Sequence, residues 1–362
     1  MPLLPSLAAI LAGIAVLFAG GELFVAGATA IALLLGIPQI VVGLTVVSLG
    51  TSAPELFVSL LALLKGGDAT ALAASNVVGS NIFNVLVVLG LSALVMPLRV
   101  RSRLVRRDVP LLIAVSMAVW GMASGTSLGW QAGLALLTGL VINTVWEIRT
   151  AREHPEESEL EVDGDAGGTL SPALIRLLLG LALLVLGSQV LVRGATTAAV
   201  MLGLSQTLIG LTIVAAGTSL PELVTSLVAA YRGSGDLAIG NVVGSNLINL
   251  LLILGVCSLA SGPAGLPVDP LLVQRDLPVM VLTTLACLPI FWTHGTITRL
   301  EGGLLATLYV LYLTEQLLTG TAPWASDSYR QVVLVVVVPL VLVFLVWQVL
   351  AWTRKRGGSG AG

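Results

Sequence analysis

Charged residues are scarce in this sequence: they make up 10% of its 362 residues, against about 25% in an ordinary soluble domain. Apolar residues make up 56%. This composition excludes a disordered protein, a nucleic-acid-binding protein and most soluble enzymes, and it places the chain in a lipid bilayer. Lysine and arginine total 17 and aspartate and glutamate total 19, so the charge balance indicates no nucleic acid or other polyanion as a partner.

Cysteine and histidine are also rare, with two of each. Cys257 and Cys287 both lie in apolar runs, so we predict small buried hydrophobic side chains rather than a disulfide. The sequence contains no Cys-x-x-Cys and no His-Glu-x-x-His motif. A zinc site, a haem site and an intramembrane metalloenzyme are therefore not expected, and no cofactor is predicted.

Long apolar runs are what the sequence has in abundance. A membrane-spanning helix needs about 20 mainly apolar residues, and on this basis we predict an all-α polytopic membrane protein with eleven spans. The predicted spans cover roughly residues 6–35, 38–64, 71–97, 108–124, 128–148, 171–202, 205–231, 237–261, 271–293, 297–319 and 331–353. The acidic segment 151–170 is predicted to be a solvated linker between the units 1–150 and 171–320. Residues 321–362 then form an extra span with a basic tail, which could serve as a lipid anchor or an oligomer contact; the oligomeric state itself is unknown from the sequence.

Lysine and arginine cluster after the third, fifth and eleventh predicted spans. With eleven spans, these clusters fall on one side of the membrane only if the N-terminus is outside. Because short loops rich in Lys and Arg stay in the cytoplasm, we predict an outside N-terminus. The acidic linker and the C-terminus then lie in the cytoplasm.

An internal repeat organises the chain. Gly43–Glu55 reads GLTVVSLGTSAPE and Gly210–Glu222 reads GLTIVAAGTSLPE, with nine of thirteen positions identical. A second block follows in each half, NVVGSNIFN at Asn76–Asn84 and NVVGSNLIN at Asn241–Asn249. Spans one to five therefore recur as spans six to ten. Because five is odd, the second copy must enter the membrane from the opposite side, an architecture typical of transporters that bind substrate at the midplane and work by alternating access.

Each copy places one carboxylate, Glu55 or Glu222, deep in a predicted span and away from its ends. A charge at the bilayer centre costs roughly 2.5–3.5 kcal/mol, so two at equivalent positions indicate a substrate site. Pro54 and Pro221 come directly before the two glutamates. A proline breaks the helix and frees the carbonyl oxygen four residues earlier. Glu22 is not duplicated in the second copy, and we predict that it makes a structural hydrogen bond.

Oxygen-bearing side chains surround these glutamates in the sequence. Carboxylates, carbonyls and hydroxyls are the ligands of hard cations such as Ca²⁺ and Na⁺. The candidate ligands beside the glutamates are the hydroxyls of Thr51, Ser52, Thr218 and Ser219, and the third and eighth spans add Ser80, Asn84, Ser245 and Asn249. Asn76, Asn81, Asn241 and Asn246 are predicted to be structural. Two carboxylates can neutralise one Ca²⁺, or several Na⁺ ions can share the same oxygens, which provides a basis for exchange.

The paired G-T-S-x-P-E and G-S-N-x-x-N motifs resemble the two alpha-repeats of the cation/Ca²⁺ exchanger superfamily, and those of prokaryotic sodium/calcium exchangers most closely. The resemblance covers spans one to ten. It implies that Glu55 and Glu222 bind Ca²⁺ and share Na⁺. It further implies oxygens for Ca²⁺ or Na⁺ from Thr51 and Thr218, oxygens for Na⁺ from Ser52, Ser80, Ser219 and Ser245, and backbone carbonyls from Ser48 and Ala215. It also implies that spans one and six slide across the other eight, and the glycines of span one, Gly13, Gly20, Gly21 and Gly27, would allow close packing and sliding.

We therefore predict a secondary transporter, not an enzyme, that exchanges Ca²⁺ for Na⁺ in the inner membrane of a prokaryotic cell. Some relatives carry Asp where this chain has Asn249, so a third carboxylate is missing, which argues against the potassium-dependent branch. The main alternative is an H⁺/Ca²⁺ antiporter that uses the same glutamates, although the proton-coupled branch more often resembles G-N-x-x-E. Mg²⁺ or another divalent substrate also stays open, as does a passive channel, which would not need an inverted repeat.

Overall fold

The computed structural model describes residues 3–66, 70–100, 104–125, 127–153, 169–202, 213, 215–293 and 295–358. Helices make up nearly all of this part of the chain, which confirms the predicted all-α membrane protein. The predicted acidic linker 151–170 and the first part of the span predicted at 205–231 lie largely outside the described residues.

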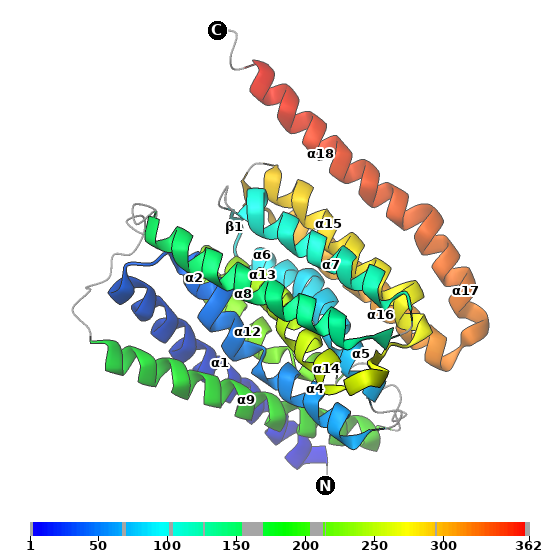
Figure 1. Cartoon of the computed structure of the whole chain (residues 1–362), viewed down its shortest axis with the longest axis horizontal. Coiled ribbons are helices and arrows are strands. Elements are labelled where there is room, and N and C mark those ends of the chain that lie inside the picture. The colour runs from blue at the N-terminus through cyan, green and yellow to red at the C-terminus, as the bar shows by residue number, and fades with distance from the viewer. Residues whose placement is uncertain are drawn as a thin grey trace.

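The first half runs from α1 to α8 (Figure 1). Its elements are α1 (Leu3–Leu35), α2 (Gln39–Val42), η1 (Gly43–Val47), α3 (Ser48–Thr51), α4 (Ala53–Lys65), α5 (Ala71–Phe83), η3 (Asn84–Leu89), α6 (Gly90–Val95), β1 (Leu98–Arg99), η4 (Leu104–Asp108), α7 (Val109–Ala123), β2 (Ser127–Leu128) and α8 (Trp130–Glu153). The η segments here are π-helical turns that continue the neighbouring helices.

The second half follows the same order and adds a final helical segment. Its elements are α9 (Leu170–Met201), α11 (Ala215–Gly217), α12 (Leu220–Tyr231), α13 (Gly235–Ile248), η7 (Asn249–Ile253), α14 (Leu254–Ala260), η8 (Gly262–Ala264), β3 (Leu266–Pro267), η9 (Leu272–Asp276), α15 (Leu277–Trp292), β4 (Thr296–Ile297) and α16 (Arg299–Thr321). The final segment consists of α17 (Pro323–Val332), η10 (Val333–Val337) and α18 (Val338–Gly358).

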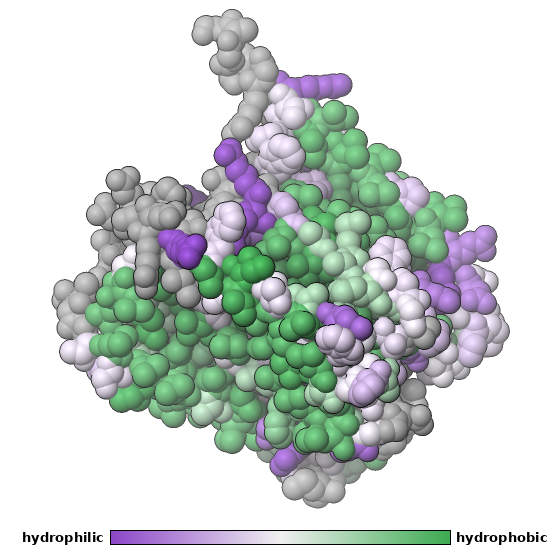
Figure 2. Space-filling view, in the orientation of Figure 1, coloured by the Kyte–Doolittle hydropathy of each residue, from purple (hydrophilic) through white to green (hydrophobic). Residues whose placement is uncertain are grey.

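Apolar side chains cover much of the face of the molecule seen in Figure 2, as expected for a surface in contact with lipid. Within the described ranges, six helices are long and apolar enough to cross a membrane, or seven if the bent pair Gln39–Thr51 and Ala53–Lys65 is one span. Each of the eleven predicted spans overlaps helical segments, but α7 and α12 are short and α8 and α16 are less apolar. The layout of ten spans plus one therefore stays a prediction.

Two helical segments form the centre of the bundle. In the apolar stretches of Ala71–Val95 and Gly235–Ala260, 78% and 83% of the residues are buried, against 33% in α1 and 28% in α9. These central segments carry the two NVVGSN blocks. Polar residues of those blocks consequently lie far from both lipid and water, where each needs a partner.

Short strands connect the two halves reciprocally. β1 pairs with β4, with Leu98 opposite Ile297, and β2 pairs with β3, with Leu128 opposite Leu266. β1 and β3 follow the central helices α6 and α14, whereas β2 and β4 precede α8 and α16. Each pairing therefore joins the strand after the central helix of one half to the strand before the last helix of the repeat in the other half.

Helices α1 and α9 lie side by side along one flank of the bundle (Figure 1). Glycines recur at seven-residue intervals on both, at positions 13, 20 and 27 of α1 and at 180, 187 and 194 of α9. A Cβ atom on Gly20 would lie 2.8 Å from the backbone nitrogen of Leu184 and 2.9 Å from the carbonyl oxygen of Gly180. The two backbones are thus in direct contact, which confirms the predicted close packing of span one. Sliding of the pair stays a prediction.

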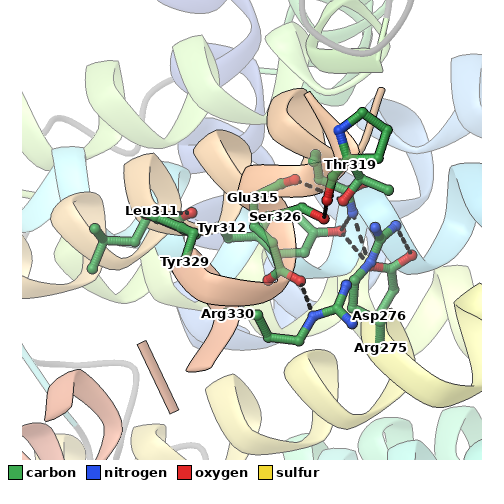
Figure 3. A network of polar contacts seen from close by, with 11 residues as sticks. Arg275, Asp276, Leu311, Tyr312, Glu315, Thr319, Ser326, Tyr329 and Arg330 are labelled. Atoms are coloured by element: carbon green, nitrogen blue, oxygen red, sulfur yellow. Dashed lines mark hydrogen bonds and ion pairs between the residues drawn. The ribbon is translucent and has the colours of Figure 1, made fainter. Parts of the chain in front are cut away.

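The final helical segment is attached to the second half through polar contacts (Figure 3). Arg330 of α17 donates from Nε to Glu315 Oε1 of α16 at 2.6 Å, and the Tyr329 hydroxyl donates to the carbonyl of Leu311 at 3.1 Å. Further along, Gln348 of α18 donates to the buried carboxylate of Glu301 at 3.1 Å. The segment is therefore docked on α16 and is more than a loosely tethered lipid anchor.

In the first half, one arginine pairs with both of the carboxylates that correspond to Asp276 and Glu315. Glu147 follows Asp108 by 39 residues, as Glu315 follows Asp276. Arg107 forms ion pairs with both Asp108 and Glu147. In the second half, Arg275 forms an ion pair with the neighbouring Asp276, and Arg330 of α17 forms the ion pair with Glu315 (Figure 3).

We expect Arg330→Gln to lower the melting temperature of the purified protein by about 3–6 °C. The Glu315 side chain is only 10% exposed, and removal of its cation should cost about 1–2 kcal/mol, less than for a fully buried pair because Arg330 is partly solvated. The double variant Arg330→Gln/Glu315→Gln should recover most of this loss, since no charge is then left unpaired. Equal melting temperatures for the wild type and Arg330→Gln would show that the ion pair does not hold the segment.

Candidate ion-binding site

Each half contains a helix that breaks just before the Pro-Glu pair that the two halves share. In the first half α3 ends at Thr51 and α4 starts at Ala53, with a bend of 41° between the two parts. In the second half α11 ends at Gly217 and α12 starts at Leu220. Both prolines fall in the first turn of the second helix, where the missing N–H costs nothing. The predicted break is thus present in both copies.

The break corrects one expectation about the glutamates. Glu55 and Glu222 were predicted to lie away from helix ends, but each is in the first turn of the helix that starts after the break. The break creates a new helix N-terminus, which lies two residues before the glutamate in each half. Free N–H groups and the helix dipole at such a terminus favour a negative charge. The break therefore helps to accommodate a carboxylate at depth.

The two breaks exchange hydrogen bonds with each other. The Ser52 hydroxyl donates to Glu222 Oε1 at 3.2 Å, and the Ser219 hydroxyl donates to Glu55 Oε1 at 2.9 Å. Each serine precedes the glutamate of its own copy by three residues. The crossed pairing therefore brings the two carboxylates to one place between the halves, and both glutamates are fully buried.

Hydroxyl groups from the central helices complete this contact. The Ser80 hydroxyl lies 3.1 Å from the Ser219 hydroxyl, which can accept a hydrogen bond from it. On the other side, Thr51 Oγ1 lies 3.4 Å from Ser245 Oγ and donates to Asn241 Oδ1 at 3.2 Å. The predicted serines of the third and eighth spans thus meet the breaks of the opposite half.

Four asparagines join the central helices. Asn81 and Asn246 each donate from Nδ2 to the backbone carbonyl of the other, at 3.4 and 3.3 Å. Asn84 Nδ2 donates to Asn246 Oδ1 and Asn249 Nδ2 donates to Asn81 Oδ1, both at 3.1 Å. Asn81 and Asn246 therefore have the predicted structural role. Asn84 and Asn249 make these bonds through their amide nitrogens. Their side-chain oxygens have no hydrogen-bond partner among the described residues and are available to bind a cation.

Five buried side-chain oxygens in this region have no hydrogen-bond partner among the described residues. They are Glu55 Oε2, Glu222 Oε2, Asn84 Oδ1, Asn249 Oδ1 and Thr218 Oγ1. Buried polar atoms almost always have a partner. A set of carboxylate, amide and hydroxyl oxygens matches what Ca²⁺ and Na⁺ bind. No group of three or more His, Cys, Asp or Glu side chains occurs in the described part of the chain, so a transition-metal cluster does not fit there.

Backbone carbonyls near the breaks already accept hydrogen bonds from other groups of the protein. The Ser48 carbonyl accepts the N–H of Ser52 at 3.0 Å and lies 3.5 Å from the Thr51 hydroxyl. Ala215 begins α11. The carbonyl of Gly217, which Pro221 was expected to free, accepts the Ser188 hydroxyl of α9 at 2.5 Å. That prediction is therefore wrong for Gly217, because α9 supplies a donor that the repeat pattern did not indicate.

Two further serines brace the glutamates and were missed in the sequence. Asn76 Nδ2 donates to the backbone carbonyl of Glu55 at 3.3 Å and to Ser59 Oγ at 3.1 Å. Asn241 Nδ2 makes the equivalent bonds, at 3.3 Å to the carbonyl of Glu222 and at 2.9 Å to Ser226 Oγ. The pattern that indicates them is a serine four residues after the glutamate in both copies.

Comparison with known proteins agrees with this reciprocal geometry. A family model described as sodium/calcium exchanger protein matches residues 5–149 and again residues 172–318. The chain belongs to the sodium/calcium exchanger family. The two matched segments correspond closely to the two halves of the repeat.

Individual relatives of this exchanger are similar over most of its length. It is 39% identical over 312 residues to "Putative antiporter CaxA" of Alkalimonas amylolytica, an alignment that covers 84% of this chain and 96% of the relative. It is 32% identical over 341 residues to sodium/calcium exchanger MaX1 of Methanosarcina acetivorans, with the same coverage of 84% and 96%. The solved structure of the sodium-calcium exchanger NCX_Mj soaked with zero Na⁺ and Ca²⁺ is 29% identical, with a TM-score of 0.73, and covers 86% of this chain and 99% of that chain.

These similarities make the chain an integral membrane exchanger of cations, of a family that transports Ca²⁺ and is not an enzyme family. The predicted membership of the prokaryotic sodium/calcium exchangers is confirmed. The coupling ion and the residues that bind the ions are separate questions.

Proposed function

We propose that this protein is a secondary antiporter that exchanges Ca²⁺ for Na⁺ by alternating access, with the ions bound between Glu55 and Glu222. The observation that carries the proposal is the group of five buried oxygens without hydrogen-bond partners in the described residues. The names of MaX1 and NCX_Mj as sodium/calcium exchangers support this choice of ions.

The ligands divide into three groups under this proposal. Glu55 and Glu222 supply the charge. The neutral oxygens that are already unpaired belong to Asn84, Asn249 and Thr218. Hydroxyls that now bond to other protein groups, and that would turn towards Na⁺ or Ca²⁺, belong to Thr51, Ser52, Ser80, Ser219 and Ser245; the carbonyls of Ser48 and Ala215 complete the set.

The charge of the site suits one divalent ion. Two ionised carboxylates neutralise one Ca²⁺, and Asn at both 84 and 249 adds oxygens without charge. Na⁺ ions can occupy the same oxygens in the other half of the cycle. Since a ligand set occupied by one ion type excludes the other, the binding of Na⁺ on one side favours release of Ca²⁺ there.

Reciprocal contacts support the inverted repeat that alternating access needs. The crossed serine–carboxylate bonds, the crossed asparagine bonds and the two strand pairings each relate one half to the other in both directions. A pseudo-two-fold arrangement explains all three. In such a fold, the two access states are related by exchange of the roles of the two repeats.

We also infer the orientation in the membrane. An outside N-terminus places Arg99, Arg106 and Arg107, which follow α6, on the cytoplasmic side. Arg354, at the end of α18, then lies on the same side, in accord with the distribution of positive charge in membrane proteins. We assign the protein to the inner membrane of a prokaryotic cell.

The test is uptake of ⁴⁵Ca²⁺ into proteoliposomes loaded with Na⁺. We expect uptake that requires an outward Na⁺ gradient and that a pH gradient without Na⁺ does not support. Uptake driven by the proton gradient alone would replace Na⁺ by H⁺ as the coupling ion and keep the same glutamates as proton carriers. Uptake without either gradient would contradict obligatory exchange and favour a channel.

A further inference from the structure

Four buried hydroxyls outside the ligand set lack hydrogen-bond partners among the described residues: those of Ser6, Ser92, Thr225 and Ser258. Ser6 lies near the start of α1, and Ser258 of α14 packs on α8, where a Cβ on Gly133 would lie 3.0 Å from its Cβ. Thr225 on α12 and Ser92 on α6 lie on two helices that contact each other, and neither residue has exposed surface. Other helical serines and threonines, such as Ser116 and Thr284, donate to a carbonyl four residues earlier. Buried hydroxyls that forgo this bond need another explanation.

The neighbours of α12 show where Thr225 points. Val224 and Val228 face α1, because a Cβ on Gly21 would lie 2.9 Å and 3.2 Å from their methyl carbons. Ser226 faces α13, where it accepts from an asparagine. Since residues turn by about 100° each in an α-helix, Thr225 points between these directions. It lies on the side of Glu222. Of the remaining neighbours of α12, α6 and η3 contact it more extensively than α9 and α3 do, and we place Thr225 against α6 and η3.

Ser92 points back towards α12 by the same reasoning. A Cβ on Gly90 would lie 2.9 Å from the Gly302 carbonyl, and a Cβ on Gly302 would lie 3.0 Å from the Cβ of Ala93, so this face of α6 packs on α16. Ser92 is two residues after Gly90 and therefore about 200° around the helix. It faces away from α16 and towards α12, the other helix that packs on α6.

Both helices lead from the ion site to the same end of the molecule. α12 runs from Glu222 to Tyr231, and η3 and α6 run from Asn84 to Val95. The residues that follow them meet, because a Cβ on Gly235 would lie 3.6 Å from the Leu98 side chain. At about 1.5 Å per residue, Thr225 lies about 4.5 Å beyond Glu222 and Ser92 about 12 Å beyond Asn84. The two hydroxyls thus stand at successive depths along one interface.

The interface related to this one by the repeat, between α4 and α14, has no such hydroxyls at the matching positions. Val58 occupies the place three residues after Glu55, and Cys257 the place eight residues after Asn249. Val58 is also 40% exposed, whereas Thr225 is fully buried. The hydroxyls between α12 and α6 therefore occur at one of the two symmetry-related interfaces and are not a consequence of the repeat.

We propose that Thr225 and Ser92 line the route by which cations pass between the site and the end of the molecule where α12 and α6 terminate. The proposal rests on the proposed exchange function. A cation that leaves the carboxylates needs replacement oxygens at each step, and hydroxyls are suitable ligands for Na⁺ and Ca²⁺. In the inferred orientation this end is the cytoplasmic one, so the route to the cytoplasm is lined with hydroxyls that the outward route lacks.

Thr225→Val and Ser92→Ala test the proposal, because they remove the hydroxyls at almost constant shape. The readouts are Na⁺-driven ⁴⁵Ca²⁺ turnover in proteoliposomes, equilibrium ⁴⁵Ca²⁺ binding to the purified protein, and the melting temperature. For each variant we expect turnover to fall about tenfold, as for the loss of one buried oxygen contact, with Ca²⁺ binding and melting temperature maintained. Thr225→Ser, which keeps the hydroxyl, should restore turnover. Val58→Ala and Cys257→Ala are the matched controls and should transport like the wild type.

A structural role would give the opposite pattern. If the hydroxyls only fill space, Thr225→Val relieves an unpaired buried group, so the melting temperature rises while turnover stays at the wild-type level. That result would overturn the proposed route and leave the exchange function intact. Failure of the wild type itself to take up Ca²⁺ under an Na⁺ gradient would instead overturn the proposed function, and the route with it.

Discussion

Replacement of Glu55 or Glu222 by glutamine should reduce Na⁺-driven ⁴⁵Ca²⁺ uptake by at least about 100-fold. Each change leaves only one carboxylate for a divalent ion in a fully buried site. The loss of one partner from a buried charge pair costs about 3–5 kcal/mol. Since about 1.4 kcal/mol corresponds to a factor of ten in binding, this cost predicts a loss of at least about 100-fold. Glutamine keeps the volume of the side chain and can still accept the hydrogen bond from the opposite serine. We therefore expect both variants to insert and to remain monodisperse in detergent.

Glu22→Gln is the matched control for these variants. Glu22 lies in α1 and forms an ion pair with Arg232 directly after α12. Such a pair is a charge-assisted hydrogen bond, in line with the structural role predicted for Glu22. Its side chain is 43% exposed, so the pair should contribute little, and uptake should stay close to that of the wild type. Near-normal uptake by Glu55→Gln or Glu222→Gln, measured beside this control, would refute the assignment of the site.

Substitution of Gly20 by valine should destabilise the whole protein. The added Cβ would lie within 3 Å of backbone atoms of Leu184 and Gly180, which cannot move without separating α1 from α9. Overpacking of this kind costs about 1–3 kcal/mol, so we expect a melting temperature lower by about 5–10 °C. Uptake should be lost at the same time if the two helices move as a unit.

Gly121→Val is the control for the glycine contact. Gly121 lies on α7, where no atom is within 4 Å of the Cβ position and the surface is exposed. The same substitution should therefore leave the melting temperature unchanged. If the two valine variants had equal stability, the contact between α1 and α9 would have to be looser than the structure shows.

The central features of the site could be predicted because they depend on local sequence. Pro54 and Pro221 dictate a helix break whatever surrounds them, and a break is present in both halves. The position of the glutamates relative to a helix end was wrong for a related reason. A span was treated as one helix, whereas the break gives the second part an N-terminus of its own.

Contacts between the halves could not be predicted in the same way. Identical motifs do not tell whether Ser52 approaches the glutamate of its own copy or that of the other, and the structure shows the second arrangement. Nor does a repeat indicate partners that it does not contain. Ser188 and Arg330 both lie at positions without a polar equivalent in the other half, and both make contacts that the sequence comparison left unassigned.

The docking of α17 on α16 has a consequence for biosynthesis. Arg330 lies 15 residues after Glu315, so at the usual rate of about 5–20 residues per second the ribosome adds it roughly 1–3 s later. During that interval Glu315 lacks its ion pair with Arg330. Because an incompletely paired carboxylate resists transfer into lipid, we expect the second half to reach its final packing only after α17 has emerged. The final segment would then determine when assembly of the second half is complete.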